Sequence, residues 1–321
     1  MTARRIGARG PYAGGVALGC MGLSEFYEPV EDREAVRIIH RALDAGMTML
    51  DTSDMYGLGE NERLLGRALR GRRDHAVVAT KGGIVRRAGD PAFRATDGHP
   101  AHLRAACDAS LTRLGIDRID VYYLHRADPR VPIEESAGAL AELVAAGKIA
   151  HAGVSELDAA TLRRAAATVP IAAVQSEWSL FTRDVETNGV LGAARELGIG
   201  VVAYAPLGRG MLTGTVRSPA TLAEHDLRRR VPRFDAPNLD RNLALVDALD
   251  GIARDIGATP GQLAIAWVLA RGEDVIALPG ATRVEHVDEN ARAANVALDA
   301  ATLARLDALV PPGAAAGARI R

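Results

Sequence analysis

Four polar residues in the first half of the sequence follow apolar runs and could together carry out acid–base chemistry. Asp51 ends an apolar run, and Tyr56 follows five residues later beside a glycine. Lys81 and His125 follow two later runs of the same kind. In parallel α/β folds the reactive side chains lie at strand ends and on the loops after them. We therefore expect these four side chains to meet at one rim.

A phenol, an ammonium, a carboxylate and an imidazole at one rim suit the stabilisation of an alkoxide. A tyrosine has a pKa of about 10, too high for easy proton donation at neutral pH. A nearby lysine lowers that pKa by favouring the phenolate, and an aspartate paired with the lysine fixes the position and charge of the ammonium. The histidine can hydrogen-bond a carbonyl oxygen and hold it near the phenol. The set contains no obvious nucleophile or metal cluster, and it predicts hydride transfer to a carbonyl group.

Length and composition allow either one large α/β barrel or two ordinary domains, at 321 residues and 48% hydrophobic content. The net charge of −1 gives no global field for nucleic acid or a charged membrane. The N-terminus is too polar for a signal peptide, and no apolar run reaches transmembrane length. Cys20 and Cys107 form neither a disulfide framework nor a metal-binding spacing. We therefore expect a cytoplasmic protein with reduced cysteines that binds neither nucleic acid nor membrane.

The pattern of apolar segments predicts eight short strands, nearly all followed by helices. The strands are expected at 16–19, 47–51, 76–80, 119–124, 149–154, 171–174, 200–204 and 275–278. Most are continuous apolar runs, as expected for strands buried on both faces. Eight such units favour a closed parallel (β/α)8 TIM barrel over two Rossmann halves, and no G-x-G-x-x-G follows the first strand. We expect residues 1–321 to form a single domain.

Two additions to the barrel are expected at its ends. Residues 4–16 contain five glycines or prolines, which predicts an N-terminal hairpin or loop plug. Extra helices are expected in the C-terminal part, at 240–256 and 300–309. The segment 82–100 is expected to be a connection rich in Gly, Pro and Arg, and a long polar excursion follows residue 208.

Taken in order, the four positions and their neighbours resemble the aldo-keto reductase superfamily over essentially the whole chain. The matching segments are DTSDMYG at 51–57, ATK at 79–81 and YYLHR at 122–126. Within the superfamily the sequence is most similar to the bacterial and plant branch, through GCMG at 19–22 and GVSE at 153–156. The resemblance implies that Tyr56 is the general acid, that Lys81 and Asp51 tune it, and that His125 orients the substrate.

The resemblance also implies a nicotinamide site without a Rossmann motif. Ser155, Glu156 and Gln175 match positions that bind the carboxamide in this family, and the ring of Tyr204 would stack on the nicotinamide. Many members have Asn where this chain has Glu156. The carboxylate therefore either replaces an amide or points away.

Two segments are expected to hold the phosphates of NADPH. Residues 206–214 expose backbone N–H groups beside small residues, with Arg209 adding charge. Residues 278–283 lead into a helix N-terminus, which suits a phosphate. By resemblance, Arg283 and His286 would meet the 2′-phosphate, which favours NADPH over NADH although Thr282 stands where similar members often have lysine. The remaining expected cofactor-binding residues are Cys20, Met21, Asp51, Ala205, Pro206, Leu207, Gly208, Gly210, Gly280 and the adenine contacts Glu289 and Asn290.

Several residues have two interpretations. Trp178 either lines the substrate pocket with Tyr56 and His125 or packs in the barrel, and the same choice holds for Phe26 and Tyr27. The three arginines at 228–230 either face solvent or belong to a clamp over the cofactor. The tail at 311–321 either borders the substrate or is disordered.

We expect an NADPH-dependent enzyme of the NADP-dependent alcohol dehydrogenase or carbonyl reductase type, acting on a small-molecule aldehyde or ketone. One alternative is an NAD(P)-linked alcohol or sugar dehydrogenase that works in the oxidative direction. The other is a cofactor-binding regulatory subunit similar to the potassium-channel β subunits, which have Asn where this chain has His125. The histidine favours the enzyme. The sequence does not indicate an oligomeric state.

Overall fold

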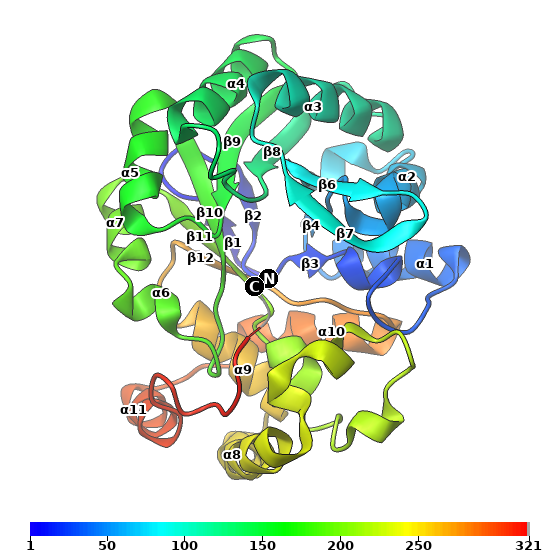
Figure 1. The fold of residues 1–321 in the computed structure, drawn as a ribbon. Helices are drawn as coiled ribbons and strands as arrows, with labels where there is room; N and C mark the ends of the chain where they lie inside the picture. The colour runs from blue at the N-terminus through cyan, green and yellow to red at the C-terminus, as the bar shows by residue number, and fades with distance from the viewer. Residues whose placement is uncertain (320–321) are drawn as a thin grey trace.

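A barrel of parallel strands forms the centre of the molecule (Figure 1). The computed structural model describes residues 1–319, apart from the side chains of residues 91 and 92. Within that range the barrel strands, in spatial order, are β3 (Leu18–Gly19), β4 (Met49–Asp51), β5 (Val77–Gly82), β8 (Ile119–Leu124), β9 (Ile149–Ser155), β10 (Ile171–Glu177), β11 (Gly200–Tyr204) and β12 (Val275–Leu278). Parallel bridges from Val16 to Ala277 and from Gly19 to Gly280 join the first strand to the last. The predicted (β/α)8 barrel is therefore confirmed.

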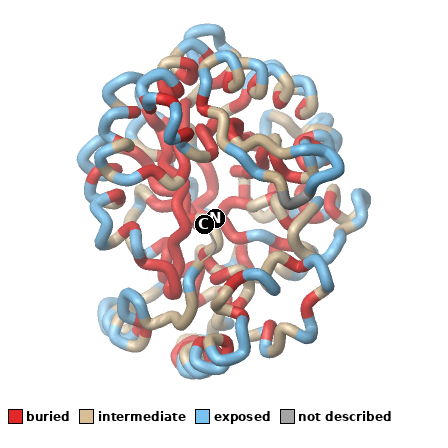
Figure 2. The backbone as a smooth tube through the Cα atoms, viewed as in Figure 1, coloured by how far each residue is buried: buried red, intermediate tan, exposed pale blue. Residues whose placement is uncertain are grey.

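Helices surround the barrel and bury their apolar faces against it (Figures 1 and 2). In the first helix the buried residues recur at intervals of three or four, from Ala35 through Ile38 and Ile39 to Leu43, so one face packs on the strands. Acidic residues in its first turn stabilise the helix, because they lie at the positive end of its dipole. The helices are α1 (Asp32–Asp44), α2 (Glu60–Ala68), α3 (Pro100–Leu114), α4 (Ile133–Ala145), α5 (Ala159–Thr168), α6 (Asp184–Thr187), α7 (Val190–Glu196), α8 (Ala236–Asp255), α9 (Pro260–Leu269), α10 (Val284–Arg292) and α11 (Ala300–Leu309).

The interior of the barrel is packed and is plugged at one end. Inward side chains such as Met49, Val121 and Ile276 form a cluster separate from the layer between strands and helices. The strands β1 (Ala3–Arg5) and β2 (Tyr12–Gly14) pair as an antiparallel hairpin, and Ile6 beside them belongs to the interior cluster. The expected N-terminal plug is thus confirmed. Because the hairpin fills the N-terminal end, chemistry is confined to the carboxyl ends of the strands.

Three segments differ from the expected pattern. The stretch 82–100 is not a plain connection, because β6 (Ile84–Arg87) and β7 (Asp90–Thr96) form an antiparallel hairpin. The strand β10 continues to Glu177, beyond the expected end at residue 174, because its polar residues still pair with β11. Residues 208–234 contain short 3-10 turns, the first of which is η4 (Gly208–Thr213). Among the described residues, no helix combines the length and the apolar character needed to cross a bilayer.

Candidate active site

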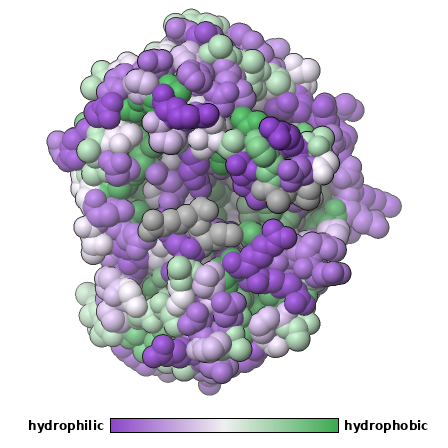
Figure 3. Space-filling view, in the orientation of Figure 1, coloured by the Kyte–Doolittle hydropathy of each residue, from purple (hydrophilic) through white to green (hydrophobic). Residues whose placement is uncertain are grey.

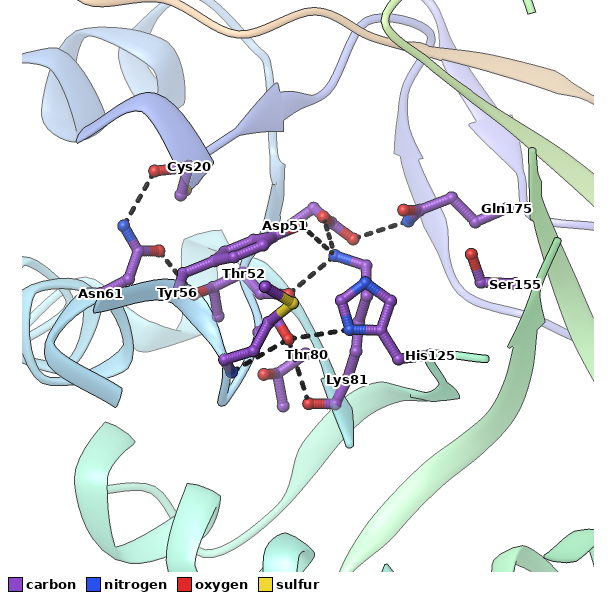
Figure 4. Close-up of polar contacts among 12 residues, drawn as sticks. Cys20, Asp51, Thr52, Tyr56, Asn61, Thr80, Lys81, His125, Ser155 and Gln175 are labelled. Carbon is purple, nitrogen blue, oxygen red and sulfur yellow. Dashed lines mark hydrogen bonds and ion pairs between the residues drawn. The ribbon is translucent and has the colours of Figure 1, made fainter. Parts of the chain in front are cut away.

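The barrel brings the four candidate catalytic residues together at the carboxyl ends of three neighbouring strands (Figure 4). Asp51 ends β4, Lys81 lies in the last part of β5, and His125 directly follows β8. Tyr56 begins the 3-10 turn η2 (Tyr56–Gly59) above them. All four side chains are buried, and Lys81 is 0% exposed.

Lys81 is held by oxygens on two sides. Its Nζ donates to a carboxylate oxygen of Asp51 and to the carbonyl oxygen of Thr52, the latter at 2.8 Å. It also donates to the hydroxyl of Tyr56 at 3.4 Å. Burial lowers the pKa of Lys81, but the Asp51 and Tyr56 oxygens outweigh burial and keep its pKa above the usual value. Lys81 is therefore a fixed cation directed at the phenol.

The hydroxyl of Tyr56 keeps its proton at neutral pH. Burial raises its pKa above the usual value, and the Lys81 ammonium opposes that effect only in part. Lys81 thus lowers the pKa of Tyr56 as expected, but burial has the larger effect. The phenol is nevertheless a competent acid for an alkoxide, which is far more basic than a phenolate, and Lys81 stabilises the phenolate that remains.

His125 is a neutral imidazole at this site. Burial, with the charges of Lys81 and Arg126, holds its pKa well below the usual value. Its Nδ1 lies 3.2 Å from Oγ of Ser53. When the Ser53 hydroxyl donates to Nδ1, the ring proton resides on Nε2 and can be donated to a carbonyl oxygen. The ring stands edge-on to that of Tyr56, with 6.2 Å between their centres.

Two buried side chains at the start of α2 support the site from behind, and the sequence reading missed both. Asn61 accepts from Oγ1 of Thr52 at 2.5 Å and donates to the carbonyl oxygen of Cys20 at 2.8 Å. Glu62 accepts from Oγ1 of Thr80 at 2.6 Å and pairs with an arginine of α3. Asn61 and Glu62 therefore each fix a threonine that is next in sequence to one of the four catalytic candidates, which we call the tetrad. The signal was present, since a carboxylate and an amide head a helix that follows the Tyr56 turn.

A cavity of about 1380 Å³ opens above the tetrad, and Figure 3 shows its mouth as a hollow near the centre of that face. Most of the expected site residues line it: Met21, Asp51, Tyr56, His125, Glu156, Gln175, Tyr204, Ala205, Pro206, Leu207, Arg209, Gly210, Gly280, Thr282, His286, Glu289 and Asn290. The expected residues that lie behind its surface or outside it are Cys20, Lys81, Ser155, Gly208, Arg283 and Trp178. Phe26 and Tyr27 line the cavity, which favours their pocket interpretation.

Trp178 does not wall the pocket. Its side chain is 0% exposed, and its indole N–H donates to a carboxylate oxygen of Glu186 at 2.9 Å. The pocket interpretation of Trp178 is therefore wrong, and the packing interpretation holds. The reason is the length of β10, which carries the chain past Gln175 to Glu177 before turning, so the indole packs in the core.

The amide end of the cavity is built from three neighbouring strand ends. The Nε2 of Gln175 donates to Asp51 at 2.8 Å, which ties β10 to the tetrad. Oγ of Ser155 accepts from Arg126 at 3.0 Å. Glu156 accepts from the backbone N–H of residue 177 at 2.9 Å, and its other oxygen accepts from Arg319 at 2.8 Å. The carboxylate of Glu156 is thus engaged by protein donors, which favours the interpretation in which it points away from a carboxamide.

Glu177 is a buried carboxylate shared by three distant arginines. Its oxygens lie 3.6 Å from Arg209, 3.8 Å from Arg233 and 3.7 Å from Arg319. The hydroxyl of Thr182 donates to Oε1 at 2.8 Å. One carboxylate therefore links the turn after β11, the segment before α8 and the C-terminal tail. The tail borders the cavity through Arg319, as one of its two interpretations required, while residues 320 and 321 lie outside the described range.

The expected phosphate segment after β11 has an unusual backbone. Gly208, Arg209 and Gly210 have φ values of +57°, +59° and +90°. Glycine adopts such values freely, but Arg209 is strained by them, which is common at functional sites. Arg228 also lines the cavity and pairs with Asp226 at 2.6 Å. Of the three consecutive arginines, only Arg228 lines the cavity, as a clamp over the cofactor would require, and its two neighbours are exposed.

The far end of the cavity lies at the start of α10. Arg283 precedes this helix, and its Nη2 lies 2.8 Å from Nε2 of His286. Asn290 donates to the carbonyl oxygen of Gly280 at 3.3 Å, and Glu289 accepts from Thr259 at 2.6 Å. A helix N-terminus with an adjacent arginine is suited to a phosphate group.

Known proteins of one family match this chain in sequence and in fold. The model of the Aldo/keto reductase family matches residues 15–311. Probable aldo-keto reductase 1 of Glycine max is 42% identical, over 98% of this chain and 90% of its own length. The NADP(+) aldo-keto reductase yakc of Schizosaccharomyces pombe is also 42% identical, over 93% of this chain and 92% of its own. The structure of a glycerol dehydrogenase from Gluconobacter oxydans superposes with a TM-score of 0.88 at 32% identity, over 99% of this chain and 97% of the other.

The barrel and its buried carboxylate, ammonium, phenol and imidazole define an oxidoreductase-type site at the carboxyl ends of the strands. The matches cover nearly the whole chain and include relatives well above 30% identity. The chain belongs to the aldo/keto reductase family.

Proposed function

We propose that the protein is an NADPH-dependent reductase of aldehydes or ketones, with Tyr56 as the proton donor. The proposal rests on the hydrogen bond from Lys81 Nζ to the Tyr56 hydroxyl, at 3.4 Å. This pair lies beside a neutral His125 at the base of a large cavity. The match of the family model to residues 15–311 supports the prediction that the chain is a single domain.

The residues divide the work of reduction between them. NADPH would supply the hydride. His125 donates from Nε2 to the carbonyl oxygen and holds it near the phenol. Tyr56 gives its proton to the same oxygen as negative charge develops there. Lys81, neutralised by Asp51, stabilises the phenolate that is left, and Gln175 fixes the second oxygen of Asp51.

The lining of the cavity fits a dinucleotide phosphate. Residues 208–210 all have left-handed backbone conformations, and the N–H groups of Gly208 and Gly210 donate to the carbonyl oxygens of residues 205 and 207, which makes a tight turn at the cavity. Arg209, Arg228 and the start of α10 add positive charge along the same cavity. Gln175 lines the cavity and retains hydrogen-bonding capacity for a carboxamide, and Tyr204, which also lines it, ends the neighbouring strand β11. The name of the relative from Schizosaccharomyces pombe supports NADP(H) as the cofactor.

The proposal is tested by following the loss of reduced-nicotinamide absorbance with purified protein, NADPH or NADH, and a panel of aldehydes and small ketones. We expect turnover with NADPH and weaker turnover with NADH. Tight NADPH binding without turnover in either direction would instead support a cofactor-binding regulatory subunit.

A second candidate function is oxidation of an alcohol or polyol by the same residues. The structural likeness to a glycerol dehydrogenase supports it. In that direction Tyr56 accepts the alcohol proton, so its phenolate is the working form. Rates of NADP(+) reduction with glycerol and short diols, compared with rates of carbonyl reduction, decide which direction dominates.

A further inference from the structure

An arginine at the mouth of the cavity takes no part in the proposed hydride transfer. Arg94 of β7 lines the cavity, and its Cζ lies 5.5 Å from the centre of the Phe26 ring. Phe26 in turn meets Tyr56 edge-on, with 6.3 Å between the ring centres. A single aromatic ring therefore separates the guanidinium of Arg94 from the proposed proton donor.

Arg94 has no carboxylate partner among the residues that the structure describes. No described residue forms an ion pair or hydrogen bond with it, and the charges that act on it most are those of Arg86, Glu25 and Arg230. Glu25 is already paired with Arg86 at 2.5 Å. Burial and the two neighbouring arginines lower the pKa of Arg94, as expected where positive charge is in excess.

Most other charges in and around the cavity are compensated within the protein. The pairs are Asp51 with Lys81, Glu156 with Arg319, and Asp226 with Arg228. Arg126 is a second exception. Its Nη1 donates to the carbonyl oxygen of His125 at 2.6 Å and to Ser155, and within the described range no acidic group pairs with it. Among the described residues, Arg94 and Arg126 are thus two cations of the cavity lining without a carboxylate partner.

We propose that the carbonyl substrates of this enzyme carry an anionic group, a carboxylate or a phosphate, and that Arg94 binds it. The inference rests on the proposed reductase function and names its substrate class. The carbonyl lies at Tyr56 and His125, a short apolar spacer lies against Phe26, and the anion meets the guanidinium. The planar fork of arginine matches both carboxylate and phosphate oxygens.

The test compares substrates that differ in charge but not in carbon skeleton. 4-Oxobutanoate is paired with butanal, and glyceraldehyde 3-phosphate with glyceraldehyde, in steady-state NADPH oxidation. We expect a higher kcat/KM for the anionic member of at least one pair. Arg94→Gln should lower that value about tenfold, since a charge-assisted hydrogen bond is lost, and leave the neutral member nearly unchanged. Arg94→Lys should retain part of the effect. If Arg94→Gln lowers kcat/KM more for 4-oxobutanoate, the bound anion is a carboxylate. If it lowers kcat/KM more for glyceraldehyde 3-phosphate, the bound anion is a phosphate.

A matched control is available on the same hairpin. Arg87 of β6 lies over Phe93, with Cζ 4.0 Å from the ring centre, and does not line the cavity. Arg87→Gln should leave both members of each pair unchanged. Added salt should raise the KM of the anionic member only, because Arg94 is exposed.

Two outcomes overturn the inference. One is a wild-type enzyme that reduces the neutral members equally well or better. The other is an Arg94→Gln variant that loses activity equally on charged and neutral members. Either leaves the proposed function standing. Failure to oxidise NADPH with any member of the two pairs or of the wider carbonyl panel would instead remove the proposed function itself.

Discussion

Arg319 in the C-terminal tail binds Glu156 at the end of β9, with 2.8 Å between Nη2 and Oε2. The same guanidinium lies 3.4 Å from Asp184 at the start of α6. Arg319 and Glu156 both line the cavity, and each side chain is only about one-sixth exposed. The pair therefore fixes one wall of the cavity beside the proposed carboxamide site.

Breaking this pair should loosen the wall. We expect Arg319→Ala and Glu156→Gln each to raise the KM for a carbonyl substrate about fivefold, the range of a partly buried ion pair. The double variant should be little worse than either single one, because both remove the same contact. Arg305→Ala, at an exposed pair on α11, serves as the control. Fully additive losses would mean that the two residues act separately.

Tyr56→Phe should abolish turnover and leave NADPH binding intact. The substitution removes the hydroxyl that meets Lys81 and keeps the ring that packs against Phe26 and His125. A general acid contributes about 10²–10⁴-fold, so we expect a fall in kcat of that order or more. Tyr12→Phe, on the exposed side of the N-terminal hairpin, should be fully active. An active Tyr56→Phe enzyme would refute this assignment of the proton donor.

The pH profile of reduction should be flat through neutrality. The pKa of His125 lies well below 6.5, so the ring stays neutral as the pH falls to that value. The pKa of Tyr56 lies above 10.0, so the proton needed for reduction is lost only on the alkaline side. We expect kcat/KM for a non-ionising ketone to be level from pH 6.5 to about 10 and to fall only above that range. An alkaline limb with its midpoint near neutrality would show that Lys81 outweighs burial.

The parts of the site that the sequence predicts are those with a local signal. Asp51, Lys81 and His125 each stand where an apolar strand ends, and parallel pairing brings such ends to one rim. The barrel followed from eight such units in order. The effect of Lys81 on the Tyr56 pKa is the one expected, but the net direction is set by burial, which depends on the whole fold and not on the spacing of charged residues.

The parts that the sequence does not predict depend on long-range contacts. The β6–β7 hairpin has no clean alternation of apolar residues, and its role in presenting Arg94 depends on where the barrel places it. Glu177 meets arginines from three separate segments, none of which is near it in the sequence. The sequence does show a charged residue, Glu177, shortly after Gln175, but it does not indicate which arginines pair with it.

Glu177→Gln should destabilise the protein. The substitution keeps the shape of the side chain but leaves three partly buried arginines with one carboxylate fewer. We expect the free energy of unfolding in urea to fall by about 3–5 kcal/mol, the range for breaking a buried ion pair. Glu135→Gln, on the exposed face of α4, should change it little. An unchanged midpoint would show that the tail and the turn after β11 are held by other contacts.

Arg283→Ala should weaken NADPH binding and leave NADH binding nearly unchanged. Burial and the charge of Arg283 lower the pKa of His286, so Arg283 is the cation of the two at neutral pH. Loss of a charge-assisted bond to a 2′-phosphate should raise the dissociation constant for NADPH about tenfold or more. Arg292→Ala, in the last turn of the same helix, is the matched control. Fluorescence titration of both cofactors measures the difference, and equal losses for NADPH and NADH would place the 2′-phosphate contact elsewhere.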